Sequence, residues 1–138
     1  MLNRWAISID AKGDLPPSEQ LVQQICFAIA SSALSEGERL PSVRSLAIEA
    51  MVNPNTVGKA WRDLERMAVL VSRPGDGVFV AEGARARASH ARDAWLGESL
   101  AHWIDDASSS GLSRAEIERC FAAALAKKRG WKRLGESA

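Results

Sequence analysis

The chain has 138 residues and a formal net charge of +1, because 18 lysines and arginines stand against 17 acidic residues. Its composition of 46% hydrophobic and 25% charged residues excludes a long disordered chain, a collagen and a disulfide scaffold. No apolar run approaches the roughly 20 residues of a membrane span, and charges come too early for a signal peptide. We therefore expect a cytoplasmic protein, without a membrane partner, that forms one domain or a small domain with an appendage.

The first part of the chain predicts a short strand and two helices. The strand is expected around residues 5–9, before the structure-breaking sequence at 14–18. The helix that follows has one apolar face, made of Leu21, Val22, Ile25, Ile29 and Ala33. Ser42 is a good N-cap for a second helix. The inward stripe of this second helix is Val43, Leu46, Ala47 and Ala50.

A third helix is predicted to begin at Asn53 and Pro54. The Asn53 side chain can cap the helix, and Pro54 suits the first helical position, where its missing N–H would have no partner. The predicted inward face is Val57, Ala60, Trp61 and Leu64. Only a few residues separate this helix from the second, and it starts with exposed polar residues. The pair therefore matches a helix-turn-helix.

Two β-rich runs, 69–73 and 78–80, surround a Pro/Gly turn and predict a β-hairpin. Three helices followed by a hairpin is the layout of a winged helix, which we assign to residues 1–81. Trp61 and Phe79 fall on predicted apolar faces, so we expect both in the core rather than on a stacking surface.

The sequence changes character from residue 82 and predicts a helical tail over residues 82–138. Residues 84–89 are rich in alanine and arginine and indicate an extended helix or a linker. An amphipathic helix follows and ends near residues 108–111. Ser113 and Glu116 then make a capping box for a last helix, whose face includes Ile117, Cys120 and Ala124. The predicted fold class is α+β and mainly helical, an N-terminal winged helix-turn-helix followed by a two-helix C-terminal dimerisation tail.

The tail is predicted to dimerise because two short helices can hardly bury its apolar face alone. Part of this face should pack across a two-fold axis. The predicted dimerisation residues are Leu96, Leu100, Trp103, Ile104, Phe121 and Leu125. The basic run at 127–133 is expected to be a frayed, solvated end.

The start of the third helix carries side chains suited to reading DNA. Direct readout needs short polar groups at the N-terminal end of a helix in the major groove, flanked by phosphate-binding groups. Asn55 can pair with adenine, and the methyl group of Thr56 can pack on thymine. Residues 39–73 carry a local charge of +3, although residues 1–81 together carry −1. Basic charge is thus concentrated around the predicted recognition helix.

Basic side chains around this helix are candidates for backbone contacts. Lys59 and Arg62 lie further along it, and Lys59 suits a phosphate. Arg44 lies at the start of the second helix, where that helix would meet the DNA backbone. Arg73 in the hairpin can reach a phosphate or the minor groove.

Plainer interpretations compete with these. Asn53 could serve only to start a helix, and Arg44 and Arg62 could be solvated surface charges. A rival hypothesis is a winged helix that acts as a protein–protein interaction module without specific DNA reading. The near-neutral charge and Asp76 favour that rival slightly. The polar helix start argues against it, because a protein-binding helix more often exposes apolar anchors.

The sequence predicts no enzyme, cofactor or metal site. It contains no P-loop, no nucleophile elbow and no Gly-rich dinucleotide turn. His90 and His102 have no third ligand nearby. Cys26 and Cys120 each fall among apolar residues at helical spacing, so we expect two buried free thiols.

Three separated motifs resemble the GntR family of bacterial transcription regulators. They are GERLPSVRSLA at residues 37–47, VNPNTV at 52–57 and GDGVFV at 75–80, and the match covers about residues 7–81. The short tail resembles that of the YtrA-like subfamily. The resemblance implies a DNA-binding regulator that dimerises through its tail and typically represses operons for ABC-type transporters or other membrane proteins. No small-molecule effector can be named from it.

The resemblance also implies roles for single residues. It implies DNA contacts from Arg44, Asn55 and Thr56, a phosphate contact from Lys59, and wing contacts around Arg73 and Gly75. The complete predicted DNA-binding set is Arg44, Asn53, Asn55, Thr56, Lys59, Arg62, Arg73 and Gly75.

Two residues depart from the family pattern. Gly58 stands where several branches place an arginine, so we expect this chain to make one base contact fewer. Asp76 puts a negative charge on the wing tip, which argues against deep insertion into the minor groove.

Overall fold

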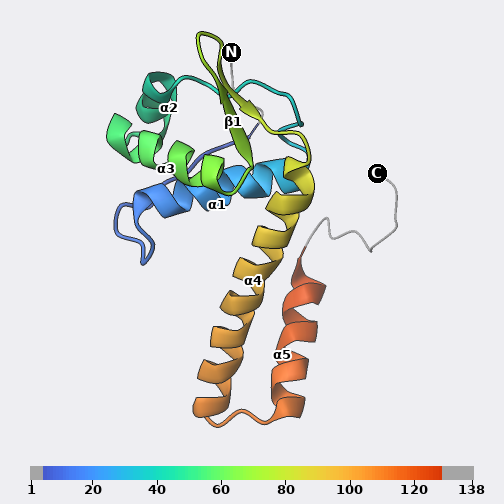
Figure 1. The fold of residues 1–138 in the computed structure, drawn as a ribbon. Coiled ribbons are helices and arrows are strands. Elements are labelled where there is room, and N and C mark those ends of the chain that lie inside the picture. Colours follow the sequence, from blue (N-terminus) through green and yellow to red (C-terminus); the bar gives the residue numbers. More distant parts are fainter. Residues whose placement is uncertain (1–4, 129–138) are drawn as a thin grey trace. The chain divides into compact units, whose positions relative to one another are not determined.

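The computed structural model describes residues 5–128, and its elements follow the order of a winged helix with a helical tail (Figure 1). The elements are α1 (Pro17–Ala30), α2 (Val43–Ala50), α3 (Pro54–Arg66), β1 (Leu70–Arg73), β2 (Gly77–Val80), α4 (Ala84–Ser109) and α5 (Arg114–Lys127). This order confirms the predicted fold class. The chain divides into two compact units, one ending at Trp95 and the other starting at Leu96. The predicted basic tail lies, beyond Lys128, outside the described residues.

The core of the first unit lies between its three helices. α3 packs on both α1 and α2. The predicted inward face of α3 is buried, namely Val57, Ala60, Trp61 and Leu64. From α1 the largest fully buried side chains are Leu21, Ile25 and Ile29. Because this side of α3 is buried, its opposite side is left for solvent.

Residues 5–9 form no strand, so that prediction was wrong. Two glutamines of α1 take up the hydrogen bonds of this segment instead. The Ser8 N–H donates to Gln24 Oε1 at 3.0 Å, and Gln24 Nε2 donates back to the Ser8 carbonyl at 2.6 Å. Gln20 exchanges the same pair of bonds with Asp10, at 2.9 and 2.8 Å. The side-chain amides of α1 therefore satisfy backbone hydrogen bonds that a neighbouring strand would otherwise satisfy.

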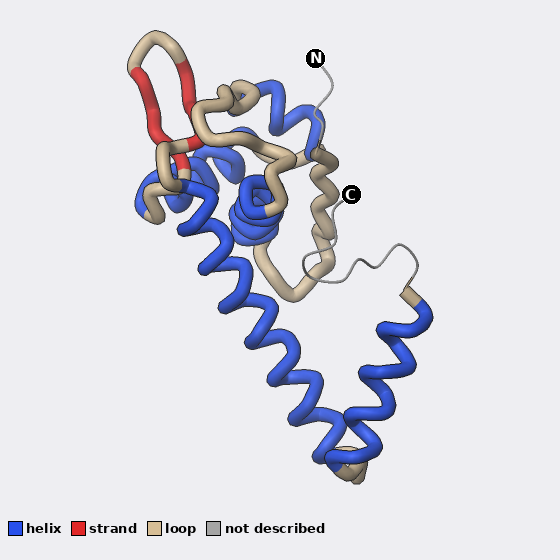
Figure 2. The backbone as a smooth tube through the Cα atoms, turned by 90° about the vertical axis from the view of Figure 1, so that its right-hand side faces the viewer, coloured by secondary structure: helices blue, strands red, loops and turns tan. Residues whose placement is uncertain are grey.

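The predicted hairpin forms the wing (Figure 2). β1 and β2 are antiparallel, with Leu70 opposite Val80 and Arg73 opposite Gly77. Residues 37–40 run along the other edge of β2 and add backbone hydrogen bonds, among them Leu40 N–H to the Val78 carbonyl at 2.8 Å.

The two faces of β2 have different roles. Val78 and Val80 pack on the core, whereas Phe79 is only half-buried and lies outside the core cluster. The prediction of a core Phe79 was therefore wrong. Successive side chains of a strand point to opposite faces, so a core that takes both valines leaves the ring between them on the outside.

α4 is one continuous helix of 26 residues, so the alanine- and arginine-rich residues 84–89 form its start (Figure 2). Its N-terminal end is tied to the first unit by side chains. The Glu36 carboxylate accepts the Gly83 N–H at 2.5 Å. Arg87 Nε donates to the Ala68 carbonyl at 2.8 Å, just beyond α3.

The second unit is a hairpin of two helices, the last part of α4 and all of α5. The predicted capping box is present: Ser113 Oγ accepts the Glu116 N–H at 3.2 Å, and the Glu116 carboxylate accepts the Ser113 N–H at 2.7 Å. Ile117 is buried, and the ring centroids of Trp103 and Phe121 are 4.8 Å apart.

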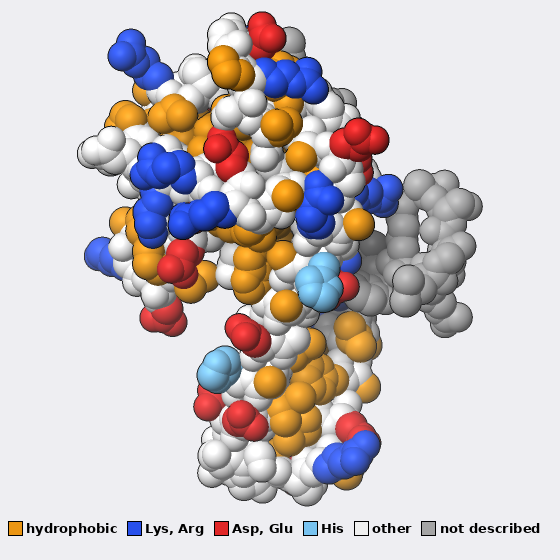
Figure 3. Space-filling view, in the orientation of Figure 1, with side chains coloured by type: hydrophobic (Ala, Val, Ile, Leu, Met, Phe, Trp, Pro, Cys, Tyr) orange, Lys and Arg blue, Asp and Glu red, His pale blue; other side chains and the backbone are white. Residues whose placement is uncertain are grey.

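Most of the apolar face of this hairpin is open to solvent. Five of the predicted dimerisation side chains are between 40 and 52% exposed, namely Leu96, Leu100, Trp103, Ile104 and Leu125. Together with Phe121 and Ala124, several of them line a groove of about 500 Å³ between the two helices. Figure 3 shows this groove as an orange patch on the lower helices.

The two cysteines have different surroundings. Cys26 is buried in α1, as predicted, and burial raises the pKa of its thiol to about 12. Cys120 is exposed on α5, so the prediction of two buried thiols was wrong for this residue. It lies on the open apolar face, which the two helices of one chain do not cover.

We expect Cys26 of the folded chain to resist a disulfide reagent at mildly alkaline pH. Cys26 stays protonated well below its raised pKa, and the thiolate is the nucleophile. Colorimetric thiol counting on Cys120→Ser checks this: its remaining thiol should react only after the chain is unfolded in denaturant. Two fast thiols in the folded wild-type chain would contradict the burial of Cys26.

Candidate nucleic-acid interface

The turn between α2 and α3 is fixed by local interactions at each end. Ser42 Oγ accepts the backbone N–H three residues on at 3.1 Å and starts α2. Met51 ends α2 in a left-handed conformation, with φ of 55°. Asn53 Oδ1 then accepts the Asn55 N–H at 2.8 Å, and Pro54 begins α3. These caps place the start of α3 at the protein surface.

The outward face of α3 carries the predicted base-reading residues. Asn55, Lys59 and Arg62 are exposed at helical spacing on one face, and Thr56 is half-buried beside them. Within residues 5–128, the Asn55 side chain makes no hydrogen bond, so its donors and its acceptor are available. Asn53 differs, because its Oδ1 already accepts one hydrogen bond as the cap of α3, so the side chain is partly used within the protein.

Arg62 extends back along α3 toward the base-reading end. A Cβ atom added to Gly58 would lie 3.5 Å from Arg62 Nη1, so this guanidinium lies over the glycine. Helical side chains lean toward the N-terminus, which allows a residue four positions later to cover this place. A positive charge from the next turn of the helix thus lies close to Gly58.

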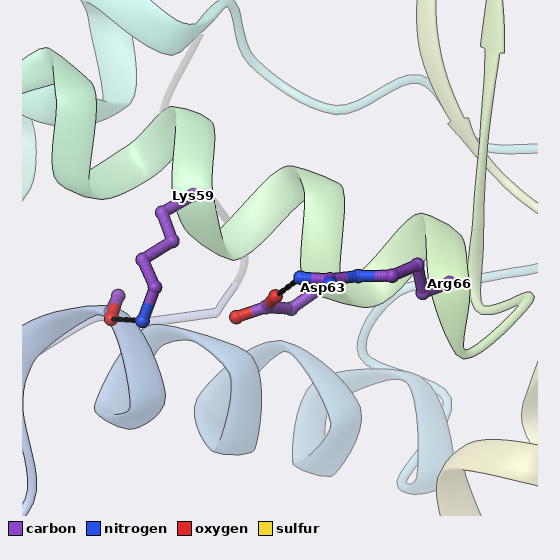
Figure 4. A network of polar contacts seen from close by, with 4 residues as sticks. Lys59, Asp63 and Arg66 are labelled. Atoms are coloured by element: carbon purple, nitrogen blue, oxygen red, sulfur yellow. Dashed lines mark hydrogen bonds and ion pairs between the residues drawn. The ribbon is translucent and has the colours of Figure 1, made fainter.

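The charged residues further along α3 are not equivalent (Figure 4). Lys59 Nζ donates to Ser18 Oγ at the start of α1, at 3.5 Å. Arg66 forms an ion pair with Asp63 on the same helix. Lys59 therefore contacts a neutral hydroxyl, whereas the charge of Arg66 is offset by its neighbour.

α2 presents one predicted and two unpredicted side chains near the turn. Arg44 is exposed on its first turn. Ile48, one turn later, is 74% exposed, and Met51 at the end of the helix is 90% exposed. The sequence signal for Ile48 was its place outside the inward stripe of α2. These apolar groups border the start of α3.

The wing holds the remaining predicted residues. Gly75 lies in the turn with φ of +81°, a left-handed conformation that favours glycine. The Cζ atom of Arg73 lies 4.5 Å from the centroid of the Phe79 ring. The ring thereby supports the guanidinium by a cation–π contact. Sequence reasoning missed this role of Phe79 because it placed the ring in the core.

Figure 3 shows lysine and arginine side chains gathered over this face of the first unit, with acidic groups among them. None of the helices in the described part of the chain is both long and apolar enough to span a membrane. The same residues contain no group of three or more His, Cys, Asp or Glu side chains that could hold a metal ion.

Comparison with known proteins identifies relatives of this chain and its fold. Residues 17–80 match the family described as bacterial regulatory proteins, gntR family. The HTH-type transcriptional repressor YtrA of Bacillus subtilis is 31% identical over 127 residues, which cover 92% of this chain and 98% of YtrA. A transcriptional regulator from Oenococcus oeni is 32% identical, with a TM-score of 0.67, over 85% of this chain and 97% of that structure.

A further solved structure contains DNA. The DNA-binding domain of AraR in complex with operator ORX1 is 26% identical to this chain, with a TM-score of 0.51. The likeness covers 55% of this chain and 98% of that domain.

Loss of the Asn53 cap should lower the free energy of unfolding. We expect Asn53→Ala to cost about 1 kcal/mol, because the Asn55 N–H loses its partner. Asn53→Asp keeps a capping oxygen and should be nearly as stable as the wild-type chain. Urea denaturation followed by circular dichroism measures both. Equal stability of the alanine and aspartate variants would show that the cap contributes nothing.

Proposed function

Because the chain belongs to the gntR family of bacterial regulatory proteins and is a DNA-binding transcriptional regulator rather than an enzyme, we propose that it is a cytoplasmic repressor that binds an inverted-repeat operator as a homodimer. The observation that carries this proposal is the capped start of α3, which presents an unbonded Asn55 side chain at the surface. The name of YtrA as a repressor supports the direction of regulation.

In this proposal α3 enters the major groove and reads bases at its first turn. Asn55 pairs with a base edge, and the Thr56 methyl group contacts a thymine. Arg44 and Lys59 bind phosphates on either side and fix the register, while Arg62 lies over Gly58 near the base-reading end. Arg73 and Gly75 bring the wing to the neighbouring DNA backbone.

Dimerisation would set the distance between the α3 helices of two copies. The open face of the second unit contains large apolar side chains that neither α4 nor α5 covers. Burying them against a second copy would remove this surface from water. A two-fold axis between the copies matches an inverted repeat, with half-sites about a helical turn or its multiple apart.

The regulated operon is proposed to encode an ABC-type transporter or another membrane protein, as the YtrA-like resemblance implies. Sequencing genomic DNA bound to the purified protein would give both the half-site and the neighbouring genes. Bound sites that lie only beside unrelated genes would contradict this part of the proposal.

Asn55→Ala should weaken binding to the selected operator by about 1–3 kcal/mol and relax the base preference at one position, because alanine cannot form the bidentate hydrogen bonds to a base. Lys59→Ala provides the contrast: it should weaken binding to all DNA sequences alike and reduce the salt dependence of binding. Fluorescence anisotropy on operator and random duplexes at two salt concentrations separates the two effects. Equal losses on both duplexes for Asn55→Ala would favour the rival interaction-module hypothesis.

Leu100→Asp should weaken dimerisation at least tenfold, because burial of one leucine contributes about 1.5–3 kcal/mol and a charge would take its place. Ala101→Asp on the same helix adds the same charge at an exposed position outside the groove and should have little effect. Analytical ultracentrifugation compares the two. A monomeric wild-type chain, or equal dimerisation of both variants, would contradict the proposed interface.

A further inference from the structure

We infer that Arg39 and Arg73 together form a phosphate clamp on the outer face of the wing, held in place by Gly77 and Phe79. Arg39 lies outside the predicted DNA-binding set, and it comes from the loop before α2 rather than from the hairpin. The inference rests on the DNA binding of the family and does not depend on dimerisation or repression.

Strand register brings the two arginines to one face of the wing. Arg73 on β1 is opposite Gly77 on β2, and Arg39 on the other side forms a β-bridge with Phe79. Directly paired residues project from the same side of a sheet, and so do residues two apart on one strand. Arg39 and Arg73 therefore flank β2 from its two edges, on the face opposite the core.

Both guanidinium groups lie across β2. A Cβ atom added to Gly77 would come within 2.9 Å of Arg39 Nε and 3.2 Å of its Nη2, so a side chain here would move the guanidinium from its present place. The φ of Gly77, +121°, also favours glycine. The guanidinium of Arg73 rests on the next outward side chain of the strand, with Cζ 4.5 Å from the Phe79 ring centroid.

The distance between Gly77 and Phe79, over which the two guanidinium groups lie, fits one phosphate group. Residues two apart on a strand are separated by about 7 Å, so the guanidinium groups at Gly77 and Phe79 are about that far apart. A phosphodiester between them can give one unesterified oxygen to each fork. Guanidinium groups bind phosphate oxygens through short, charge-assisted hydrogen bonds.

The electrostatics of the wing face also favour an anion. Within the described residues, neither Arg39 nor Arg73 has an acidic ion-pair partner, whereas Arg66, Arg92 and Arg114 each have one. Two like charges held on one small sheet repel each other, and an anion between them removes that cost. Asp76 is the only acidic residue between Leu70 and Val80, and it lies in the turn.

Ethylation interference tests whether the two arginines share a phosphate. The probe is a defined duplex that the wild-type protein selects from a randomised pool. Ethylation removes the charge of one phosphate at a time, so each phosphate that the protein needs appears as a loss of binding. Arg39→Ala and Arg73→Ala should each lose part of their sensitivity at the same phosphate, and the double variant should lose all of it. Losses of sensitivity at different phosphates, or no loss for Arg39→Ala, would overturn the clamp.

Salt titration on a random-sequence duplex of about 30 base pairs, roughly three helical turns, gives a test that needs no operator. The Arg39→Ala/Arg73→Ala double variant should reduce the slope of log K against log salt by about 0.9, because the phosphate that both arginines hold is no longer neutralised. Arg119→Ala removes one exposed charge from α5 and should leave the slope unchanged. An unchanged slope for the double variant would overturn the inference. A failure of base reading by Asn55 would leave this result unaffected.

Phe79→Leu tests the positioning role of the ring. It should weaken binding to the random duplex in the wild-type background but not in the Arg73→Ala background, while Phe79→Tyr, which keeps the ring, should bind normally. Equal losses in both backgrounds would overturn this role. Thermal unfolding verifies that each variant folds, and Arg39→Gln, which keeps most of the side-chain stem, is measured beside Arg39→Ala for the same reason.

Discussion

The surface proposed to face DNA depends on the burial of one side of α3. Val57, Ala60, Trp61 and Leu64 pack into the core between α1 and α2, and this packing sets the rotation of the helix about its axis. A different rotation would bury charged side chains without partners, at a cost of several kcal/mol. Asn55 and Arg62 therefore point outward because of what lies opposite them. The cap at Asn53 adds the second constraint, the position at which the helix begins.

Much of this could be predicted because the signals are local. The caps at Ser42 and Asn53 and the capping box at Ser113 each involve residues at most three apart, and all three form as the sequence indicated. The apolar spacing of α3 identified its buried side for the same reason. The outward residues of α3 could thus be inferred without any knowledge of the tertiary structure.

The errors share a different cause, which is dependence on distant parts of the chain. Residues 5–9 have the composition of a strand, but their backbone hydrogen bonds are made with glutamine side chains of α1 and not with a neighbouring strand. Phe79 lies in a continuous apolar run, and such a run does not indicate which face of the strand packs on the core. Arg39 was counted only as local charge, since its bridge to Phe79 joins residues far apart in sequence. Cys120 was expected to be buried because the apolar spacing of α5 predicts an apolar face. This spacing does not say whether another part of the protein covers that face, and Cys120 is exposed.

The net charge of +1 also has a structural explanation. Among the described residues, arginines with acidic partners include Arg66, near the end of α3, and Arg92 and Arg114, outside the winged-helix elements. No ion pair within residues 5–128 involves Arg39, Arg44, Arg62 or Arg73, which lie on the loop before α2, on α2, on α3 and on the wing. Attraction to phosphates depends on which charges are left uncompensated and where they lie, and less on the sum over the chain. A nearly neutral chain can therefore carry a positive DNA-facing surface when its acidic residues are paired or placed elsewhere.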